Sequence, residues 1–160
     1  MEERVRLLFV DDDELTIAAL KRVFAKEPYE LYAANSGAAA LQLLSNRRID
    51  IIVCDQNMPG MSGVEFLERV YEKHRNVMRV MLSGVGSIQA MKAPSGEPPA
   101  SIDLATKSKL SAARNQLKQL AYNDAQVHRF LEKPWNDTEL RSVVADMAAI
   151  VRSNRKRPSA

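Results

Sequence analysis

The stretch from Ile49 to Gly63 reads Ile-Asp-Ile-Ile-Val-Cys-Asp-Gln-Asn-Met-Pro-Gly-Met-Ser-Gly, and it decides the fold class. Its apolar part, Ile51 to Cys54, is short and rich in β-branched residues, which is typical of a strand buried on both faces. Asp55 follows this run directly, and Pro59 and the glycines around it then interrupt regular structure. A carboxylate therefore lies at the carboxyl end of a buried strand, where open α/β sheets bind their ligands.

Strands and helices alternate along the rest of the chain. Four further short apolar runs predict strands at Val5–Val10, Tyr29–Ala33, Val77–Leu82 and Val127–Leu131. Apolar residues at helical spacing predict helices over 14–26, 37–46, about 64–71 and 140–150. This alternation implies right-handed crossovers and a parallel sheet. We therefore predict an α/β fold, a five-stranded parallel sheet with helices on both faces.

Composition restricts the class of protein. The chain has 160 residues, 46% hydrophobic and 27% charged, which is typical of one globular domain. No apolar run approaches the roughly 20 residues that span a bilayer, and the amino terminus lacks the apolar core of a signal peptide. Cys54 is the single cysteine, so it excludes an internal disulfide and fits a small buried core residue. We therefore expect a cytoplasmic protein without membrane contact.

Two basic groups stand out against a net charge of only +3. One is a tail with Arg152, Arg155, Lys156 and Arg157, and the other contains Lys107, Lys109, Arg114 and Lys118. Basic groups of this kind can bind nucleic acid. No base-reading motif accompanies them, which favours a solvated tail and a solvated helix face. Nucleic acid is therefore not an expected partner of this domain.

The interval from Ser83 to Lys133 is too long for one helix with short loops, which needs roughly 20 to 25 positions. Residues 93–100 contain three prolines and a glycine and predict a linker. The fourth helix could be the short run 87–92 or a longer helix from Ser101 to about Tyr122. The longer one is favoured, because it has an apolar stripe of Leu110, Ala113, Leu117 and Leu120 that needs a partner. We assign 1–152 to one domain, 93–120 within it to an insertion or a remodelled fourth helix, and 153–160 to a basic tail.

Polar side chains follow the predicted strands at their carboxyl ends: Asp11 and Asp12, Asp55, Ser83 and Lys133. Because the carboxyl ends of parallel strands share one edge, we expect these groups to converge. Clustered carboxylates need a cation, and hard oxygen ligands with room for water suit Mg²⁺. An aspartate nucleophile, a divalent metal, a lysine and a hydroxyl are what phosphoryl transfer requires. Each residue taken alone has an ordinary structural explanation, such as a helix cap, a turn or a solvated lysine.

Four motifs resemble those of receiver domains in two-component response regulators. They are Val10-Asp-Asp-Asp-Glu14, Asp55-Gln-Asn-Met-Pro-Gly-Met-Ser-Gly63, Leu82-Ser-Gly84 and Arg129-Phe-Leu-Glu-Lys-Pro-Trp135. The resemblance covers Val5 to about Val151, apart from the extra segment. It implies the (βα)₅ flavodoxin-like receiver fold, in accord with the strand count.

The resemblance also implies the roles of the site residues. It makes Asp55 the phosphoacceptor, with Ser83 and Lys133 contacting the phosphoryl group. The implied Mg²⁺ ligands are Asp11, Asp12, Asp55 and the backbone carbonyl of Asn57. Ser83 and Phe130 match the switch positions, and the aromatic ring turns inward on phosphorylation. Asp13 is an additional third aspartate, although Asp11 and Asp12 remain the natural match.

By this resemblance, a sensor histidine kinase, a phosphotransfer protein or a small phosphodonor phosphorylates Asp55 with Mg²⁺. The implied protein is a switch with slow autodephosphorylation, not an enzyme with a separate substrate. A hydrolase with an aspartate nucleophile is disfavoured, because such enzymes need a second acid where this chain has Asn57. Two questions stay open: whether the predicted helix 101–122 pairs two copies into a homodimer as the output, and whether an output domain follows Ala160.

Overall fold

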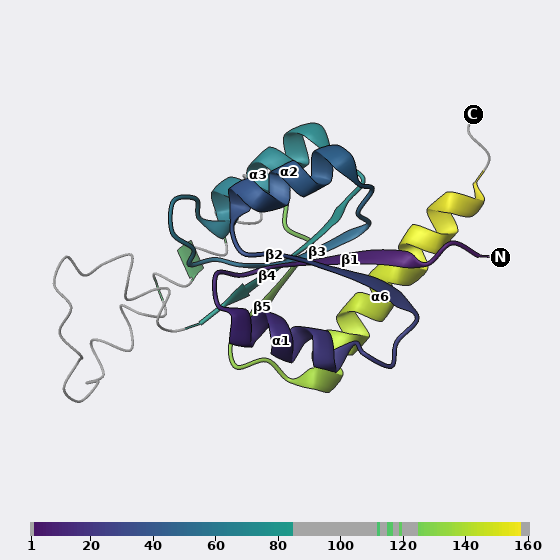
Figure 1. Cartoon of the computed structure of the whole chain (residues 1–160), viewed down its shortest axis with the longest axis horizontal. Coiled ribbons are helices and arrows are strands. Elements are labelled where there is room, and N and C mark those ends of the chain that lie inside the picture. Colours follow the sequence, from purple (N-terminus) through teal and green to yellow (C-terminus); the bar gives the residue numbers. More distant parts are fainter. Residues whose placement is uncertain (1, 85–111, 113–114, 117–118, 120–124, 158–160) are drawn as a thin grey trace, which may run out of the picture.

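Five parallel strands pair in the order β2-β1-β3-β4-β5 and form one sheet (Figure 1). The structure is a computed structural model, which describes residues 2–84, 112, 115–116, 119 and 125–157. The strands are β1 (Val5–Val10), β2 (Tyr29–Ala34), β3 (Ile51–Asp55), β4 (Met78–Ser83) and β5 (Arg129–Glu132). All four pairings are parallel, and β1, β3 and β4 are flanked by strands on both sides. The predicted five-stranded parallel sheet is confirmed.

Helices cover both faces of the sheet (Figure 1). On one face lie α1 (Glu14–Val23) and α6 (Asp137–Lys156), and on the other lie α2 (Gly37–Asn46) and α3 (Gly63–Lys73). Each helix begins after a side chain that accepts a hydrogen bond from its first turn: Asp13, Ser36, Ser62 and Asn136. Within the described part of the chain, no helix is both long and apolar enough to cross a membrane.

Alternation along the central strands divides the core into two halves. Leu8 and Val10 of β1 pack with α2 and α3, whereas Leu7 and Phe9 pack with α1 and α6. In β3, Ile51 packs in the same half of the core as Leu7 and Phe9, on the side of α1 and α6. Successive side chains of a strand point to opposite faces, so a strand covered on both faces has to be apolar throughout. This is why β1 and β3 were visible as continuous apolar runs.

The predicted boundaries differ most from the structure in α1, β5 and α6, and elsewhere by no more than one or two residues. Helix α1 ends at Val23 rather than at residue 26, and β5 begins at Arg129 rather than at Val127, after Gln126 with its positive φ of 50°. Helix α6 continues to Lys156, so the first half of the assigned basic tail, 153–156, is helical. Apolar contacts with the sheet extend along α6 as far as Val151, and basic residues in its last turn suit the helix dipole.

The extra segment falls largely outside the described residues. The predicted linker 93–100 and the apolar stripe of Leu110, Ala113, Leu117 and Leu120 lie there, as does the alternative fourth helix at 87–92. Between 85 and 124 only four positions are described, and all four are helical and exposed: Ala112, Asn115, Gln116 and Gln119. Their helical state agrees with the helix predicted from Ser101 to about Tyr122. Pairing through that helix stays a prediction.

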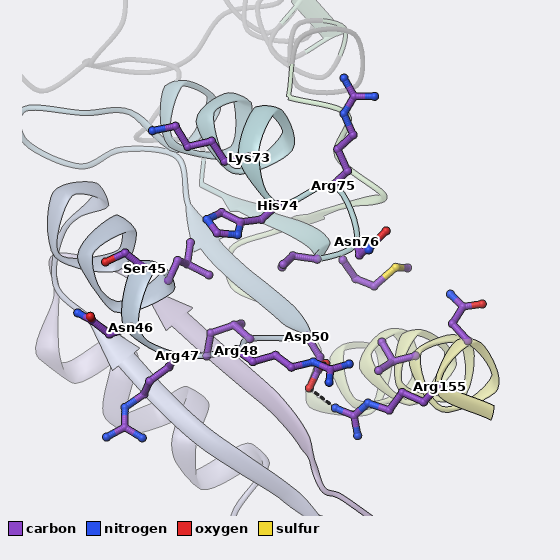
Figure 2. A pocket seen from close by; sticks show the side chains of 16 residues that line it. Ser45, Asn46, Arg47, Arg48, Asp50, Lys73, His74, Arg75, Asn76 and Arg155 are labelled. Carbon is purple, nitrogen blue, oxygen red and sulfur yellow. Dashed lines mark hydrogen bonds and ion pairs between the residues drawn. The ribbon is translucent and has the colours of Figure 1, made fainter. Parts of the chain in front are cut away.

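A buried carboxylate ties α6 to the amino edge of the sheet. Asp50, only 5% exposed, directly precedes β3. Its Oδ2 accepts hydrogen bonds from the backbone N–H of Arg6, at 2.8 Å, and from Nη2 of Arg155, at 2.7 Å (Figure 2). Arg48 lies farther away, with Nε 3.7 Å from Oδ1. A buried carboxylate with charge-assisted bonds is costly to leave unpaired, so this contact fixes the last turn of α6.

We expect Asp50→Asn to destabilise the domain by about 1.5 to 3 kcal/mol, the usual contribution of a hydrogen bond to a charged group. The measurement is urea unfolding followed by circular dichroism. Arg48→Gln is the matched control, because that arginine is 60% exposed and its removal should cost under about 1 kcal/mol. If the two variants lost the same free energy of unfolding, the buried contacts of Asp50 would contribute no more to stability than an exposed ion pair.

Candidate functional site

The polar side chains at the strand ends meet at the carboxyl edge of the sheet. Asp11 follows β1, and Asp55 is the last residue of β3. One carboxylate oxygen from each of Asp11, Asp12 and Asp55 can be chosen so that all lie within 4.8 Å of one another. Asp11 and Asp55 are buried and Asp12 is exposed, so the cluster opens to solvent on one side. The structure thus brings together the three acids that the sequence singled out.

Lys133 bridges two of these acids from the far end of the chain. Its Nζ lies 2.9 Å from Oδ2 of Asp11 and 3.0 Å from Oδ1 of Asp55. The residue follows directly after β5, whose backbone continues the sheet because the N–H of Lys133 donates to the carbonyl of Ser83 at 2.9 Å. The ammonium therefore reaches the acids through strand pairing and not through a flexible loop.

Negative charge exceeds positive charge in this cluster. Burial raises the pKa of the Asp55 carboxyl above its ordinary value; Lys133 lowers it, while Asp11 and Asp12 raise it further. Burial by itself lowers the pKa of Lys133, but its bonds to Asp11 and Asp55 outweigh that effect and its pKa is raised. The shift of Asp55 comes mainly from burial and from its acidic neighbours, and the shift of Lys133 comes from its two carboxylate partners. The cluster therefore carries a net negative charge, which a further cation could neutralise.

Asp13 has a structural role that separates it from this cluster. It is the N-cap of α1: its Oδ1 accepts from the N–H of Leu15 at 3.0 Å, and its Oδ2 accepts from the hydroxyl of Thr16 at 3.0 Å. Its own N–H donates to Oδ1 of Asp11 at 2.9 Å and so orients that carboxylate. The third consecutive aspartate therefore supports the site without sharing in it.

Three further predicted site residues lie on β4, on β5 and in the loop after β3. Ser83 ends β4 and is 5% exposed, and its Oγ has no hydrogen-bond partner among the described residues. Phe130 of β5 is half-buried and packs against the half of the core that α2 and α3 cover. Asn57 is exposed in the loop after β3. A buried hydroxyl without a partner is costly in a folded protein and marks a position prepared for an acceptor.

Gln56 is a buried residue that the sequence analysis overlooked. Its N–H donates to the carbonyl of Leu82, its carbonyl accepts from Gly63, and its side-chain Oε1 accepts from the N–H of Val64 at 3.0 Å. A Cβ on Gly63 would lie 2.3 Å from the carbonyl oxygen of Asp55, so only glycine allows this approach. The start of α3 is thereby held against the phosphoacceptor candidate.

Cys54 is a buried core residue, as the sequence predicts. The thiol is fully buried, and its Sγ donates to the carbonyl oxygen of Asp55 at 3.1 Å. Burial raises the pKa of the thiol well above its ordinary value, so the reactive thiolate is suppressed. Cys54 therefore belongs to the core beneath the site.

The acidic cluster fits Mg²⁺ by the chemistry of its donors. Mg²⁺ binds hard oxygen atoms, uses only a few carboxylates and keeps several of its waters. Asp11 and Asp55 supply buried carboxylates, Asp12 supplies an exposed one, and the open side leaves space for water. A divalent cation would also relieve the charge excess that raises the pKa of Asp55.

The raised pKa makes a prediction about stability. The folded state holds the Asp55 proton more tightly than the unfolded chain, so stability is greatest below the unfolded pKa and falls as the pH rises through the folded pKa. In metal-free buffer at pH 7, Asp55→Asn should therefore unfold at a higher urea concentration than the wild type. The difference should disappear at a pH below about 3.9, the unfolded pKa of aspartate.

Added Mg²⁺ should reverse this order, because the ion stabilises only the chain that binds it, by about 2.7 kcal/mol at one hundred times its Kd. Equal stabilisation of wild type and Asp55→Asn by Mg²⁺ would contradict the assignment of Asp55 to the metal site.

Comparisons with known proteins identify the family of this domain. The family "Response regulator receiver domain" matches residues 7–94. Sporulation initiation phosphotransferase F of Bacillus subtilis is 30% identical over 87 residues, which are 54% of this chain and 70% of that protein. Hydrogenase transcriptional regulatory protein HoxA of Cupriavidus necator is 35% identical over 83 residues, 52% of this chain and 17% of that protein.

Solved structures extend the likeness beyond residue 94. The signal receiver domain of an HD domain-containing protein from Pseudomonas fluorescens matches with a TM-score of 0.69 and 28% identity, over 95% of this chain and 99% of that one. The chain spans only about a sixth to a quarter of the two HoxA relatives that it matches. The matched residues, the fold and the acidic edge together show that this chain belongs to the response regulator receiver domain family.

Proposed function

We propose that this receiver domain accepts a phosphoryl group on Asp55 in a Mg²⁺-dependent step and thereby switches an interaction surface. The observation that carries the proposal is the bridge from Lys133 to both Asp11 and Asp55 at the open carboxyl edge. The bridge brings an aspartate, its acidic neighbours and a cation into one place, which is the arrangement that phosphoryl transfer to a carboxylate needs.

In the proposed step, a carboxylate oxygen of Asp55 attacks the phosphorus atom of a phosphohistidine. A new O–P bond forms, the N–P bond breaks, and the histidine nitrogen keeps the electron pair and later takes a proton. To reset the switch, water attacks the phosphorus, the O–P bond breaks, and inorganic phosphate leaves the regenerated carboxylate.

Each neighbouring group has a part in this proposal. Asp11, Asp12 and Asp55, with the backbone carbonyl of Asn57, would hold Mg²⁺, which supplies charge neutralisation for the phosphoryl oxygens. Lys133 already lies at hydrogen-bond distance from Asp55 and would pair with the incoming dianion. Ser83 offers the hydroxyl that lacks a partner in this state.

Pairing between β4 and β5 offers a route for the switch. Ser83 lies opposite Glu132 and Met81 lies opposite Phe130 in the register of these strands. A phosphoryl group that draws Ser83 toward Asp55 would shift the end of β4, and Phe130 on the paired strand would repack. The new charge at Asp55 biases this two-state element.

A hollow of about 640 Å³ beside the site suits docking of the phosphodonor protein. It opens between α1 and α2 next to Asp11, and its apolar lining includes Ile17, Ala18 and Leu43. Leu15 at the start of α1 is 80% exposed. We propose that a sensor histidine kinase or a phosphotransfer protein contacts this side, and that the output is carried by a partner or by a further domain of a longer chain.

The central test is labelling by a small phosphodonor such as acetyl phosphate. We expect wild-type protein to be phosphorylated only with Mg²⁺ and Asp55→Asn to remain unlabelled. Asp13→Asn is the matched control, because it removes the same charge while asparagine caps a helix equally well. Labelling that survives Asp55→Asn, or that needs no divalent metal, would refute the proposal.

A second test separates phosphorylation from switching. Ser83→Ala should leave stability nearly unchanged, because the hydroxyl that it removes has no partner among the described residues. The variant should still be labelled, but it should lose the conformational response. Trp135, the single tryptophan, is two residues beyond Lys133 and packs on the core, so its fluorescence reports that response. A full fluorescence change in phosphorylated Ser83→Ala would remove Ser83 from the switch.

A further inference from the structure

A second hollow lies at the amino edge of the sheet, at the opposite end of β3 from Asp55. Its volume is about 960 Å³. One wall is the chain from Leu44 to Asp50 after α2, the other is the chain from Lys73 to Met78 after α3, and residues of the last turns of α6 complete it (Figure 2). Asp50 and Asp55 are five positions apart along the chain, or roughly 16 Å of strand, so the two sites do not overlap.

The lining of this hollow is strongly cationic. It contains five permanently charged side chains, Arg47, Arg48, Lys73, Arg75 and Arg155, against the single carboxylate of Asp50. His74 also lies in the lining and adds a titratable group. The sequence analysis did not single out Arg47, Arg48, Lys73 or Arg75, because their convergence depends on the crossovers.

Two of the five cations are already neutralised, and three are not. Arg155 and Arg48 turn toward Asp50 (Figure 2). Across the described residues, Arg47, Lys73 and Arg75 form no ion pair; the two guanidinium groups lie over tyrosine rings, 5.5 Å and 5.3 Å from the ring centroids. Figure 2 shows these three side chains around the rim with their charged ends directed outward. All three are exposed, so their ends can swing toward an anion.

The negative groups around the hollow do not cancel this charge. Helices α2, α3 and α6 all end at the hollow, and each helix end is equivalent to about half a negative charge. Glu3 lies 4.0 Å from both Arg48 and Arg155, so with Asp50, Glu3 and the three helix ends the negative charge is about three and a half. The five cations exceed that sum, so an excess of positive charge remains at the rim.

The wall between α3 and β4 is held in place from behind. The guanidinium of the buried Arg79 donates to the carbonyls of Val77, at 2.6 Å, and of Gln126, at 3.1 Å. Because Arg79 holds the backbone of this wall, ligand binding should need no backbone change there. Only the exposed side chains at the rim would lose conformational freedom. Ordering them costs conformational entropy, which predicts weak to moderate affinity.

We propose that this hollow binds a small anion that carries two or more phosphate groups, either a nucleotide or a free polyphosphate. Arginine presents a planar fork of donors that matches phosphate oxygens, and lysine adds a point charge. A volume of about 960 Å³ falls in the range of small-molecule sites, roughly 300 to 1,000 Å³. The proposal is independent of phosphorylation at Asp55, because the two sites lie at opposite edges of the sheet.

The experiment is a titration of ¹⁵N-labelled Asp55→Asn protein with pyrophosphate, ADP or adenosine in magnesium-free buffer, followed by amide chemical shifts. Removal of Asp55 and of the metal excludes binding at the acidic edge. We expect saturable shifts over 45–50 and 73–78 with both phosphate compounds and none with adenosine. Tighter binding of ADP identifies a nucleotide, and equal binding identifies a free polyphosphate.

Lys73→Gln combined with Arg75→Gln should weaken binding about tenfold, which is about 1.4 kcal/mol. Arg22→Gln combined with Lys26→Gln removes the same charge from the α1 side of the molecule and should leave binding unchanged. The proposal fails if neither phosphate compound shifts these loops at millimolar concentration, or if both double variants weaken binding equally. It also fails if a short DNA duplex binds the hollow while pyrophosphate does not.

Discussion

An excess of negative charge at the carboxyl edge of the sheet is the constraint on which this receiver domain depends. Asp11 and Asp55 are buried side by side, and one ammonium group, that of Lys133, lies between them. Burial makes their repulsion stronger than it would be in water. The sheet tolerates this strain because its central strands are held by apolar packing on both faces. The shortage of positive charge suits the site to a cation, and the proposed phosphoryl group would need that cation to offset its own negative charge.

The two buried aspartates at the ends of β3 have opposite electrostatic surroundings. Asp55 at the carboxyl end is surrounded by other acids, which raise its pKa together with burial. Asp50, just before the strand, is surrounded by arginines and accepts bonds from Arg6 and Arg155. One carboxylate is therefore a candidate for chemistry and the other stabilises the fold, although both are almost fully buried. The difference comes from the neighbours that the crossovers bring in.

The sequence allowed the sheet, the four described helices and the acidic edge to be predicted because these depend on short-range patterns. Strand ends such as Asp55 follow an apolar run directly, and parallel strands bring their ends to one edge. The buried contacts of Gln56 and Arg79 could not be predicted, because a polar residue beside a strand has no periodicity that marks it as buried. The end of α6 was missed for a related reason: Arg155 is basic, but it is held by Asp50 from another element.

Forty-five residues separate the end of β4 from the start of β5, and β5 nevertheless pairs in register and delivers Lys133. The entropy of closing a loop grows only with the logarithm of its length, so a doubling costs about 0.6 kcal/mol. A charge-assisted hydrogen bond of the kind that Lys133 makes, at about 1.5 to 3 kcal/mol, exceeds that cost. The length of the interval can therefore change with little effect on the pairing of β5, on which the position of Lys133 depends.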